Sequence, residues 1–160
     1  MNVLVAIDDS DLSKHLIEEI ATRQWPGDYF FLVFHVVAMP SSEYWQDWGF
    51  SVWPDLKEKL LTEADKLVQK NVAYLNEKLE PKTPVEGSVA EGHVCDSIIK
   101  LATEWPADLI MLGSHGRTGI EKFFLGSVAE GVLLQAPCSI EIIKLKKEHS
   151  KFESVVRSAG

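Results

Sequence analysis

Four small residues in the last third of the chain have the types and the spacing of a phosphate-binding loop. Gly113 and Gly116 are three positions apart, and Gly126 and Ser127 follow after nine intervening residues. Because glycine has no Cβ, it reaches positive φ and lets a ligand approach the backbone closely. A helix that begins near Ser127 would present unpaired N–H groups to an anion, and the Ser127 hydroxyl would either donate to a phosphate or cap the helix. The pattern predicts a nucleotide site between residues 113 and 127.

Two charged residues extend this chemistry. Arg117 lies inside the loop, and its planar guanidinium suits the geometry of phosphate oxygens. Asp8 follows the first apolar run, where its carboxylate would repel a phosphate unless a divalent cation such as Mg²⁺ or Mn²⁺ lay between them. Each residue also has a plainer interpretation, since Asp8 can cap the helix that follows it and Arg117 can lie on the surface.

Two common phosphate loops are excluded by the sequence. The pattern Gly-x-x-x-x-Gly-Lys-Ser/Thr does not occur, and DDSD follows the first apolar run instead of Gly-x-Gly-x-x-Gly. A P-loop hydrolase and a dinucleotide oxidoreductase are therefore disfavoured. The net charge of −8 and the pI near 5.1 argue against binding to nucleic acid or to anionic membranes. A phosphate site must therefore be local and built mainly from backbone N–H groups.

The elements that must position these residues alternate along the chain. Apolar runs rich in β-branched residues predict buried strands, and apolar positions at helical spacing predict helices between them. We expect strands at residues 3–7, 29–37, 85–89, 107–112 and 138–143, and helical patterns at 12–20, 56–79, 96–102 and 120–134. This alternation predicts a single-domain α/β fold, with an open, twisted, five-stranded parallel sheet and helices on both faces. Ligands of such sheets bind beyond the carboxyl ends of the strands.

An aromatic segment between the second strand and the long helix shows neither strand nor helix periodicity. Its aromatic residues are Tyr44, Trp45, Trp48, Phe50 and Trp53. The segment could close over a nucleotide or form part of a dimer surface, because exposed aromatic clusters mark interfaces. It could equally cover the sheet and complete the core.

The hexapeptide GSVAEG occurs at residues 87–92 and again at 126–131. A repeated structural unit would also repeat its flanking residues. The flanks differ completely, so we interpret the match as coincidence. The first copy is expected to leave a strand, and the second to start a helix.

Cys95 and Cys138 lie far apart without Cys-x-x-Cys spacing, so we expect buried structural thiols rather than a zinc or redox site. The first ten residues, MNVLVAIDDS, lack the features of a secretory signal. No apolar run approaches the roughly 20 residues that a bilayer span needs. These observations predict a cytoplasmic protein without a membrane segment.

The loop and its flanks resemble the universal stress protein family, and specifically its ATP-binding branch. That branch carries Gly-x2-Gly-x9-Gly-Ser/Thr, and the segments VAIDDS, FHVV, GSHGRTG and LLQAPCSI are also similar to the family. The resemblance extends over residues 2–144. It implies a universal stress protein domain at 1–144, a polar tail at 145–160, and an adenine nucleotide alpha hydrolase-like, Rossmann-like fold.

The resemblance also implies a role for each matching residue. The implied adenine contacts are Ala6, Ile7 and Val36, those at the ribose and base are Leu112 and Gly113, and those at the phosphates are His115, Gly116, Arg117, Gly126, Ser127 and Val128. Asp8 is implied to lie by the nucleotide and to help hold Mg²⁺ or Mn²⁺ on the phosphates. The implied ligand is ATP, or ADP or AMP.

Two residues depart from the family pattern. Many relatives have glycine or another small residue where this chain has Asp9, whose charge would weaken nucleotide binding or make it depend more on metal. Glu141 lies in the last strand, where an apolar residue is usual. That strand often pairs with its twin across a dimer in the family, so a homodimer through it is expected, with a geometry that Glu141 leaves open.

Three functions are compatible with these residues. The first is a nucleotide-binding regulatory protein of the stress response. The second is a slow ATPase or phosphotransferase that uses Asp8 or His115, and the third is a stress-family dimer that acts through protein contacts without binding nucleotide. We favour the first, because the glycine spacing is intact and no activated nucleophile with a positioned base is evident. We expect at most weak ATP hydrolysis.

Overall fold

The structure is a computed structural model, and it describes residues 1–38, 53–115 and 125–144. Most of the aromatic segment, Gly116, Arg117 and the polar tail at 145–160 lie outside these residues. Strands and helices alternate within the described ranges. They are β1 (Asn2–Ala6), α1 (Asp11–Thr22), β2 (Phe30–Ala38), α2 (Trp53–Lys78), β3 (Val85–Gly92), α3 (Val94–Glu104), β4 (Leu109–Gly113), α4 (Ser127–Gln135) and β5 (Ser139–Ile143).

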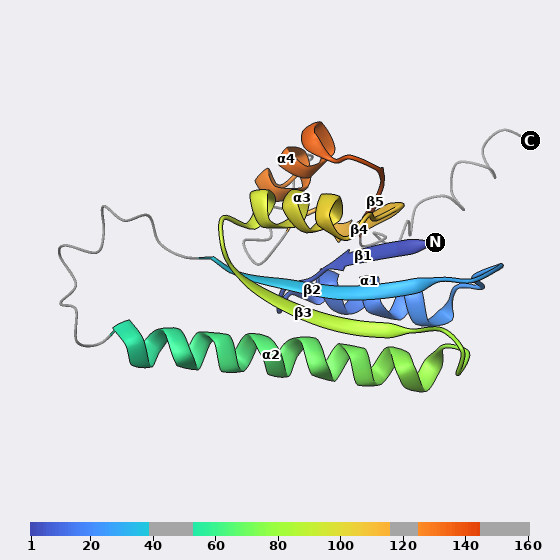
Figure 1. The fold of residues 1–160 in the computed structure, drawn as a ribbon, viewed down its shortest axis with the longest axis horizontal. Helices are drawn as coiled ribbons and strands as arrows, with labels where there is room; N and C mark the ends of the chain where they lie inside the picture. Colours follow the sequence, from blue (N-terminus) through green and yellow to red (C-terminus); the bar gives the residue numbers. More distant parts are fainter. Residues whose placement is uncertain (39–52, 116–124, 145–160) are drawn as a thin grey trace, which may run out of the picture.

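The strands form one parallel sheet in the order β3-β2-β1-β4-β5 (Figure 1). The chain builds outward from β1 to β3 and then returns to place β4 on the other side of β1. The direction of strand addition therefore reverses between β1 and β4, and the carboxyl ends of these two strands form the switch point at which such sheets bind ligands. The predicted single-domain α/β fold with a five-stranded parallel sheet is confirmed.

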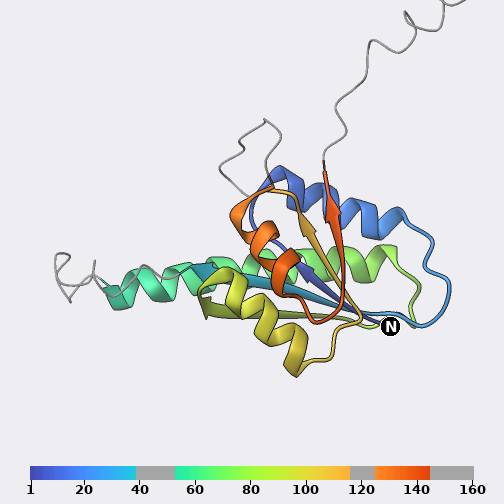
Figure 2. The same cartoon turned by 90° about the horizontal axis from the view of Figure 1, so that it is seen from above.

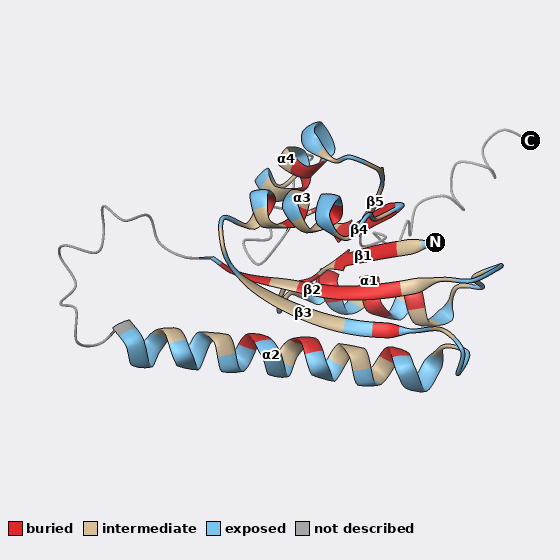
Figure 3. Ribbon diagram, in the orientation of Figure 1, coloured by how far each residue is buried: buried red, intermediate tan, exposed pale blue. Residues whose placement is uncertain are grey.

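Helices α1 and α2 cover one face of the sheet, and α3 and α4 cover the other (Figure 2). Because side chains alternate along a strand, Val3 and Val5 pack beneath α1 and α2, whereas Leu4 packs beneath α3 and α4. The buried residues are concentrated in the strands (Figure 3). Burial on both faces is the reason why these strands are continuous apolar runs in the sequence.

Two boundaries near β3 differ from the sequence prediction. β3 continues to Gly92 instead of ending at Val89, because each of its residues pairs in register with β2. The first GSVAEG copy therefore lies entirely within the strand, whereas the prediction had it leave the strand after Val89. α3 begins at Val94, two residues before the predicted start.

The last helix begins at Ser127, whereas the apolar pattern predicted helical residues from 120 onward. α4 starts at Ser127, and its N-cap Gly126 has extended backbone angles, with φ −64° and ψ 152°. Leu125 is not helical either, and residues 120–124 lie outside the described part of the chain. The second GSVAEG copy does start a helix, as predicted.

The two cysteines lie in different environments. Cys95 lies in α3 and is buried in the core on the α3 and α4 side of the sheet, whereas Cys138 is half-buried, so the prediction of a buried thiol is confirmed for Cys95 alone. Burial raises the pKa of both thiols, which favours the protonated and unreactive form. Within the described ranges, no helix has both the length and the hydropathy that crossing a bilayer requires.

Candidate functional site

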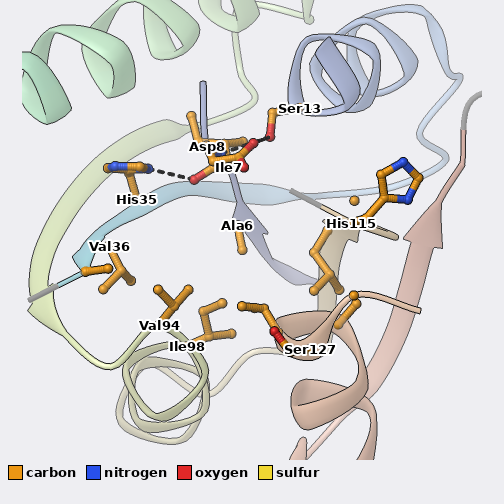
Figure 4. Close-up of a pocket in the computed structure, with 16 residues that line it drawn as sticks. Ala6, Ile7, Asp8, Ser13, His35, Val36, Val94, Ile98, His115 and Ser127 are labelled. Atoms are coloured by element: carbon orange, nitrogen blue, oxygen red, sulfur yellow. Dashed lines mark hydrogen bonds between the residues drawn. The ribbon is translucent and has the colours of Figure 1, made fainter. Parts of the chain in front are cut away.

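A cavity of about 260 Å³ opens at the carboxyl ends of β1, β2 and β4, beside the first turns of α3 and α4 (Figure 4). Every predicted site residue that the structure describes lines this cavity. These residues are Ala6, Ile7, Asp8, Val36, Leu112, Gly113, His115, Gly126, Ser127 and Val128. Gly116 and Arg117 lie outside the described residues. The fold thus gathers the described residues of the predicted site at one place, and contact of each residue with a nucleotide stays a prediction.

One end of the cavity is apolar. Val36 lies there at the end of β2, and Val94 and Ile98 lie below it in the first turns of α3 (Figure 4). Val36 and Ile98 are only 7% and 2% exposed. The two α3 residues were not predicted, although the sequence carried a signal: they are four positions apart on one helix face, directly after β3. Such walls suit a flat, largely apolar group such as a nucleobase.

Close backbone packing explains the glycines in the loop after β4. A Cβ built on Gly126 would lie 3.0 Å from the His115 Cα and 3.1 Å from the Ser114 carbonyl oxygen. A Cβ on Gly113 would lie 2.8 Å from Leu12 Cδ2 in α1. Gly126 has a negative φ, and Gly113 is not among the described glycines with positive φ. The expectation that these two positions need a positive φ is therefore wrong. Glycine is needed there because other atoms of the chain, in the loop and in α1, lie too close for a Cβ.

The start of α4 supplies hydrogen-bond donors to the other end of the cavity. The first bond within the helix runs from the Glu130 N–H to the Gly126 carbonyl at 2.8 Å. The N–H groups of Ser127, Val128 and Ala129 therefore have no partner within the helix, and all three residues line the cavity. Ser127 is the first helical residue and not the cap, so its exposed hydroxyl is not used for capping. A helix start of this kind attracts anions.

Asp8 lies beside the cavity and is held by the turn that leads into α1. Its Oδ1 accepts hydrogen bonds from the Ser10 N–H at 3.1 Å, the Ser10 hydroxyl, and the Ser13 hydroxyl at 2.7 Å. The N-cap of α1 is Ser10, so the alternative interpretation of Asp8 as the cap is wrong. Among the described residues, no group of three or more His, Cys, Asp or Glu could hold a metal ion. A cation at Asp8 would therefore depend on oxygens of the ligand.

Two polar residues that the sequence analysis did not identify also line the cavity. His35 in β2 contacts the Ile7 carbonyl through its ring Nδ1 at 2.8 Å, and Ser13 in α1 accepts the Asp8 N–H at 2.9 Å (Figure 4). The peptide group between Ile7 and Asp8 is therefore held at both its oxygen and its nitrogen. The signals in the sequence were a histidine within an apolar strand and a serine in the first turn of a helix.

His115 lines the cavity in the loop after β4, and its ring points away from Ser127 (Figure 4). Its Nδ1 is 2.9 Å from the hydroxyl of Ser114, a residue that is 2% exposed. This partner is a neutral hydroxyl, whereas a carboxylate orients the histidine of a catalytic triad. The pairing of His115 with Ser114 is therefore not the one that orients a general base.

Glu141, the departure in the last strand, is paired within its own chain. β5 forms one edge of the sheet, and the Glu141 carboxylate accepts from both terminal nitrogens of Arg23, with Nη1 to Oε2 at 2.8 Å. Hydrogen bonding from the Arg23 guanidinium holds the pKa of Glu141 below its ordinary value. The carboxylate is thus charged at neutral pH and compensated by the residue that caps the C-terminus of α1.

Known proteins resemble this chain in both sequence and fold. The model of the universal stress protein family matches residues 1–144. Universal stress protein MJ0531 from Methanocaldococcus jannaschii is 31% identical over 153 residues, covering 91% of this chain and 83% of that protein. A universal stress protein family member from Arabidopsis thaliana, solved with AMP bound, has a TM-score of 0.65 at 17% identity and covers 97% of this chain and 98% of its own.

The universal stress protein from Archaeoglobus fulgidus in complex with dAMP has a TM-score of 0.56 at 22% identity, covering 90% of this chain and 98% of its own. At these identities the two solved structures show a shared fold. The family match over residues 1–144 and the identity to MJ0531 extend the relationship to the sequence. This chain therefore belongs to the universal stress protein family.

Proposed function

We propose that this chain binds an adenine nucleotide, principally ATP, and acts as a regulatory protein of the stress response whose state depends on that ligand. One observation carries the proposal: a single cavity at the switch point of the sheet is lined by every described residue of the predicted site. Residues from β1, β2, β4 and α4 come together there, although they are far apart in the sequence.

The two ends of the cavity match the two ends of a nucleotide. The apolar end, with Val36, Val94 and Ile98, suits the base, and the start of α4 suits the phosphates. The net charge of −8 repels phosphates on average, so a phosphate would depend on such local donors. Arg117, in the same loop, would add a guanidinium.

Mg²⁺ or Mn²⁺ is proposed to accompany the phosphates. Asp8 lies beside the cavity with its Oδ1 held by Ser10 and Ser13, so its carboxylate has a fixed position for a cation. A cation bound there would offset the repulsion between Asp8 and the phosphates. Affinity for ATP should therefore depend on metal, and the charge of Asp9 should increase that dependence.

Nucleotide complexes of proteins with this fold support the choice of ligand. The Arabidopsis thaliana protein was solved with AMP and the Archaeoglobus fulgidus protein with dAMP, and both ligands carry adenine. The geometry at His115 gives no support to catalysis, because its Nδ1 is paired with the neutral hydroxyl of Ser114 instead of a carboxylate. We therefore propose a binding role rather than turnover.

Homodimerisation through β5 is the second part of the proposal. β5 is an edge strand, and edge strands present unpaired backbone groups to other chains. The neighbouring α4 exposes Leu133 and Leu134, which are 53% and 78% accessible. Arg23 compensates the charge of Glu141 within the same chain, so the carboxylate in β5 need not repel the β5 strand of a second copy. Sedimentation of the purified protein should give twice the monomer mass.

Calorimetric titration with ATP tests the nucleotide site directly. Saturable binding is expected with MgCl₂ present, with weaker binding in EDTA and weaker binding of GTP. Mass spectrometry of the purified protein would identify any adenine nucleotide that it retains. A lack of saturable binding of ATP, ADP and AMP with metal present would refute the proposal. Release of labelled phosphate from ATP, lost in Asp8→Ala, would instead indicate an enzyme.

A further inference from the structure

The main-chain ladder between β1 and β2 ends at an identifiable bond. In a parallel sheet, alternate residues of a strand pair toward opposite neighbours. On the β3 side, the Phe31 N–H donates to the Pro84 carbonyl at 3.0 Å. On the β1 side, the Phe34 carbonyl accepts from the Ile7 N–H at 2.9 Å. By this alternation, the N–H and C=O of Val36 point toward β1.

The next rung of this ladder would run from the Val36 N–H to the Ile7 carbonyl, and a side chain takes its place. His35 Nδ1 lies 2.8 Å from that carbonyl oxygen (Figure 4). Since a carbonyl can only accept, Nδ1 carries the proton of this bond. β1 ends at Ala6, and the backbone bonds among the described residues include none from Val36 to Ile7. The imidazole therefore ends the ladder one rung early.

Ser13 holds the nitrogen side of the peptide group between Ile7 and Asp8, and the chain turns away from Val36 there. The Asp8 N–H donates to Ser13 Oγ at 2.9 Å, and this hydroxyl donates to Asp8 Oδ1 at 2.7 Å. The chain then turns into α1 instead of continuing β1 alongside β2. Val36 lines the cavity at the place that a longer β1 would occupy.

We infer that His35 is a positioning residue, which holds the Ile7 carbonyl and so keeps the main-chain N–H and C=O of Val36 open to the ligand. This inference rests on the proposed function. An adjacent donor and acceptor on one strand complement the edge of adenine, which carries a ring-nitrogen acceptor beside an amino donor. Without the imidazole, the Ile7 carbonyl pairs with the Val36 N–H, and the sheet gains a rung where the base would bind.

Amide hydrogen exchange without nucleotide tests the ladder. In the wild type, the Val36 amide should exchange much faster than that of Phe34, which lies within the ladder. In His35→Val, a strand-forming change without a donor, exchange at Val36 should slow about tenfold or more because a ladder bond forms. His35→Asn should keep exchange fast, since its amide can donate to the Ile7 carbonyl. His15→Leu removes an imidazole from α1, outside the cavity lining, and should change nothing.

ATP titration of the same variants tests the consequence for the ligand. His35→Val should bind ATP about tenfold more weakly, as expected for one lost hydrogen bond, with a Tm equal to or above that of the wild type. His35→Asn should bind within about twofold of the wild type. A merely structural role would instead lower Tm and affinity together.

Equal exchange at Val36 in the wild type and His35→Val would overturn the inference, as would a loss of affinity that His35→Asn does not rescue. His35→Leu provides a second aliphatic variant should His35→Val not fold. A wild type that binds no adenine nucleotide would refute the proposed function. The exchange rates of the unliganded protein would still decide whether His35 ends the ladder.

Discussion

The hexapeptide GSVAEG occurs twice in this chain and adopts two different structures. At residues 87–92 it forms most of β3, and at 126–131 it forms the N-cap and the start of α4. The first copy pairs in register along β2, whereas the second begins with the Gly126 N–H bonded to the Ser114 carbonyl at 2.7 Å. Because the six residues are identical, the surroundings decide between strand and helix. Tertiary contacts here override local preference.

The glycines at equivalent positions of the two copies meet different needs. The first glycine of the hexapeptide is Gly87 in one copy, where it faces α2. In the other copy it is Gly126, where it faces the backbone of the loop after β4. The last glycine has a positive φ of 135° as Gly92 and lies within a helix as Gly131. Substitution of each glycine should therefore have a different effect, and the four variants can break or sharpen the comparison.

Gly126→Val should have the largest effect, a loss of ATP affinity of about a hundredfold, near the upper end of overpacking strain. Its Cβ would meet the backbone of Ser114 and His115, which cannot rotate away, so the start of α4 must shift out of the cavity. Calorimetric titration measures this effect, with Gly131→Ala in the same helix as the control. Unchanged affinity in Gly126→Val would count against the site.

Gly87→Ala should lower the free energy of unfolding by about 2 kcal/mol. The new Cβ would lie 2.4 Å from Val68 Cγ1 in α2, and Val68 is 1% exposed, so β3 and α2 would have to separate. Urea denaturation measures the change. In a Val68→Ala background most of the cost should disappear, and an equal cost there would show that α2 is not the cause.

Gly92→Ala should cost about 1 kcal/mol through backbone strain alone. Its positive φ disfavours an L side chain, while the nearest atom to the new Cβ, Ser97 Oγ, would be at an ordinary 3.5 Å. The free energy of unfolding should therefore fall, and no substitution of a neighbouring side chain should restore it. A stability equal to that of the wild type would mean that the turn between β3 and α3 adopts another conformation.

Gly131→Ala should have the smallest net effect, within about 0.5 kcal/mol of the wild type. Alanine favours a helix over glycine by about 1 kcal/mol, but the Cβ would lie 2.8 Å from Cys95 Sγ. These two contributions oppose each other. In a Cys95→Ala background the same change should stabilise by about 1 kcal/mol in urea denaturation, as expected from the helix propensity. A loss of stability in that background would exclude the thiol as the cause.

The order of the elements was predictable because buried parallel strands are apolar on both faces. β4 at Leu109–Gly113 lies close to the run expected at 107–112. The end of β3 was not predictable, since GSVAEG has few bulky apolar residues and becomes a strand only by pairing with β2. Such pairing is a long-range contact that local patterns do not record.

The location of the candidate site was predictable for a topological reason. Its residues follow the carboxyl ends of β1, β2 and β4, which the sheet order brings to one edge. The roles of His35 and Ser13 were not predictable, because each depends on a side chain that reaches a particular backbone atom of Ile7 or Asp8. Their residue types alone do not specify such bonds.

The central place of β1 has a consequence for the chain as it is synthesised. β1 leaves the ribosome before the other strands of this sheet, but its two neighbours arrive at very different times. β2 follows soon after α1, whereas the partner of Val3 on the other side is Leu109 in β4. We expect β1, β2 and β3 to assemble on α1 and α2 while one edge of β1 still lacks its partner. During that interval the nascent chain is most exposed to aggregation through this edge.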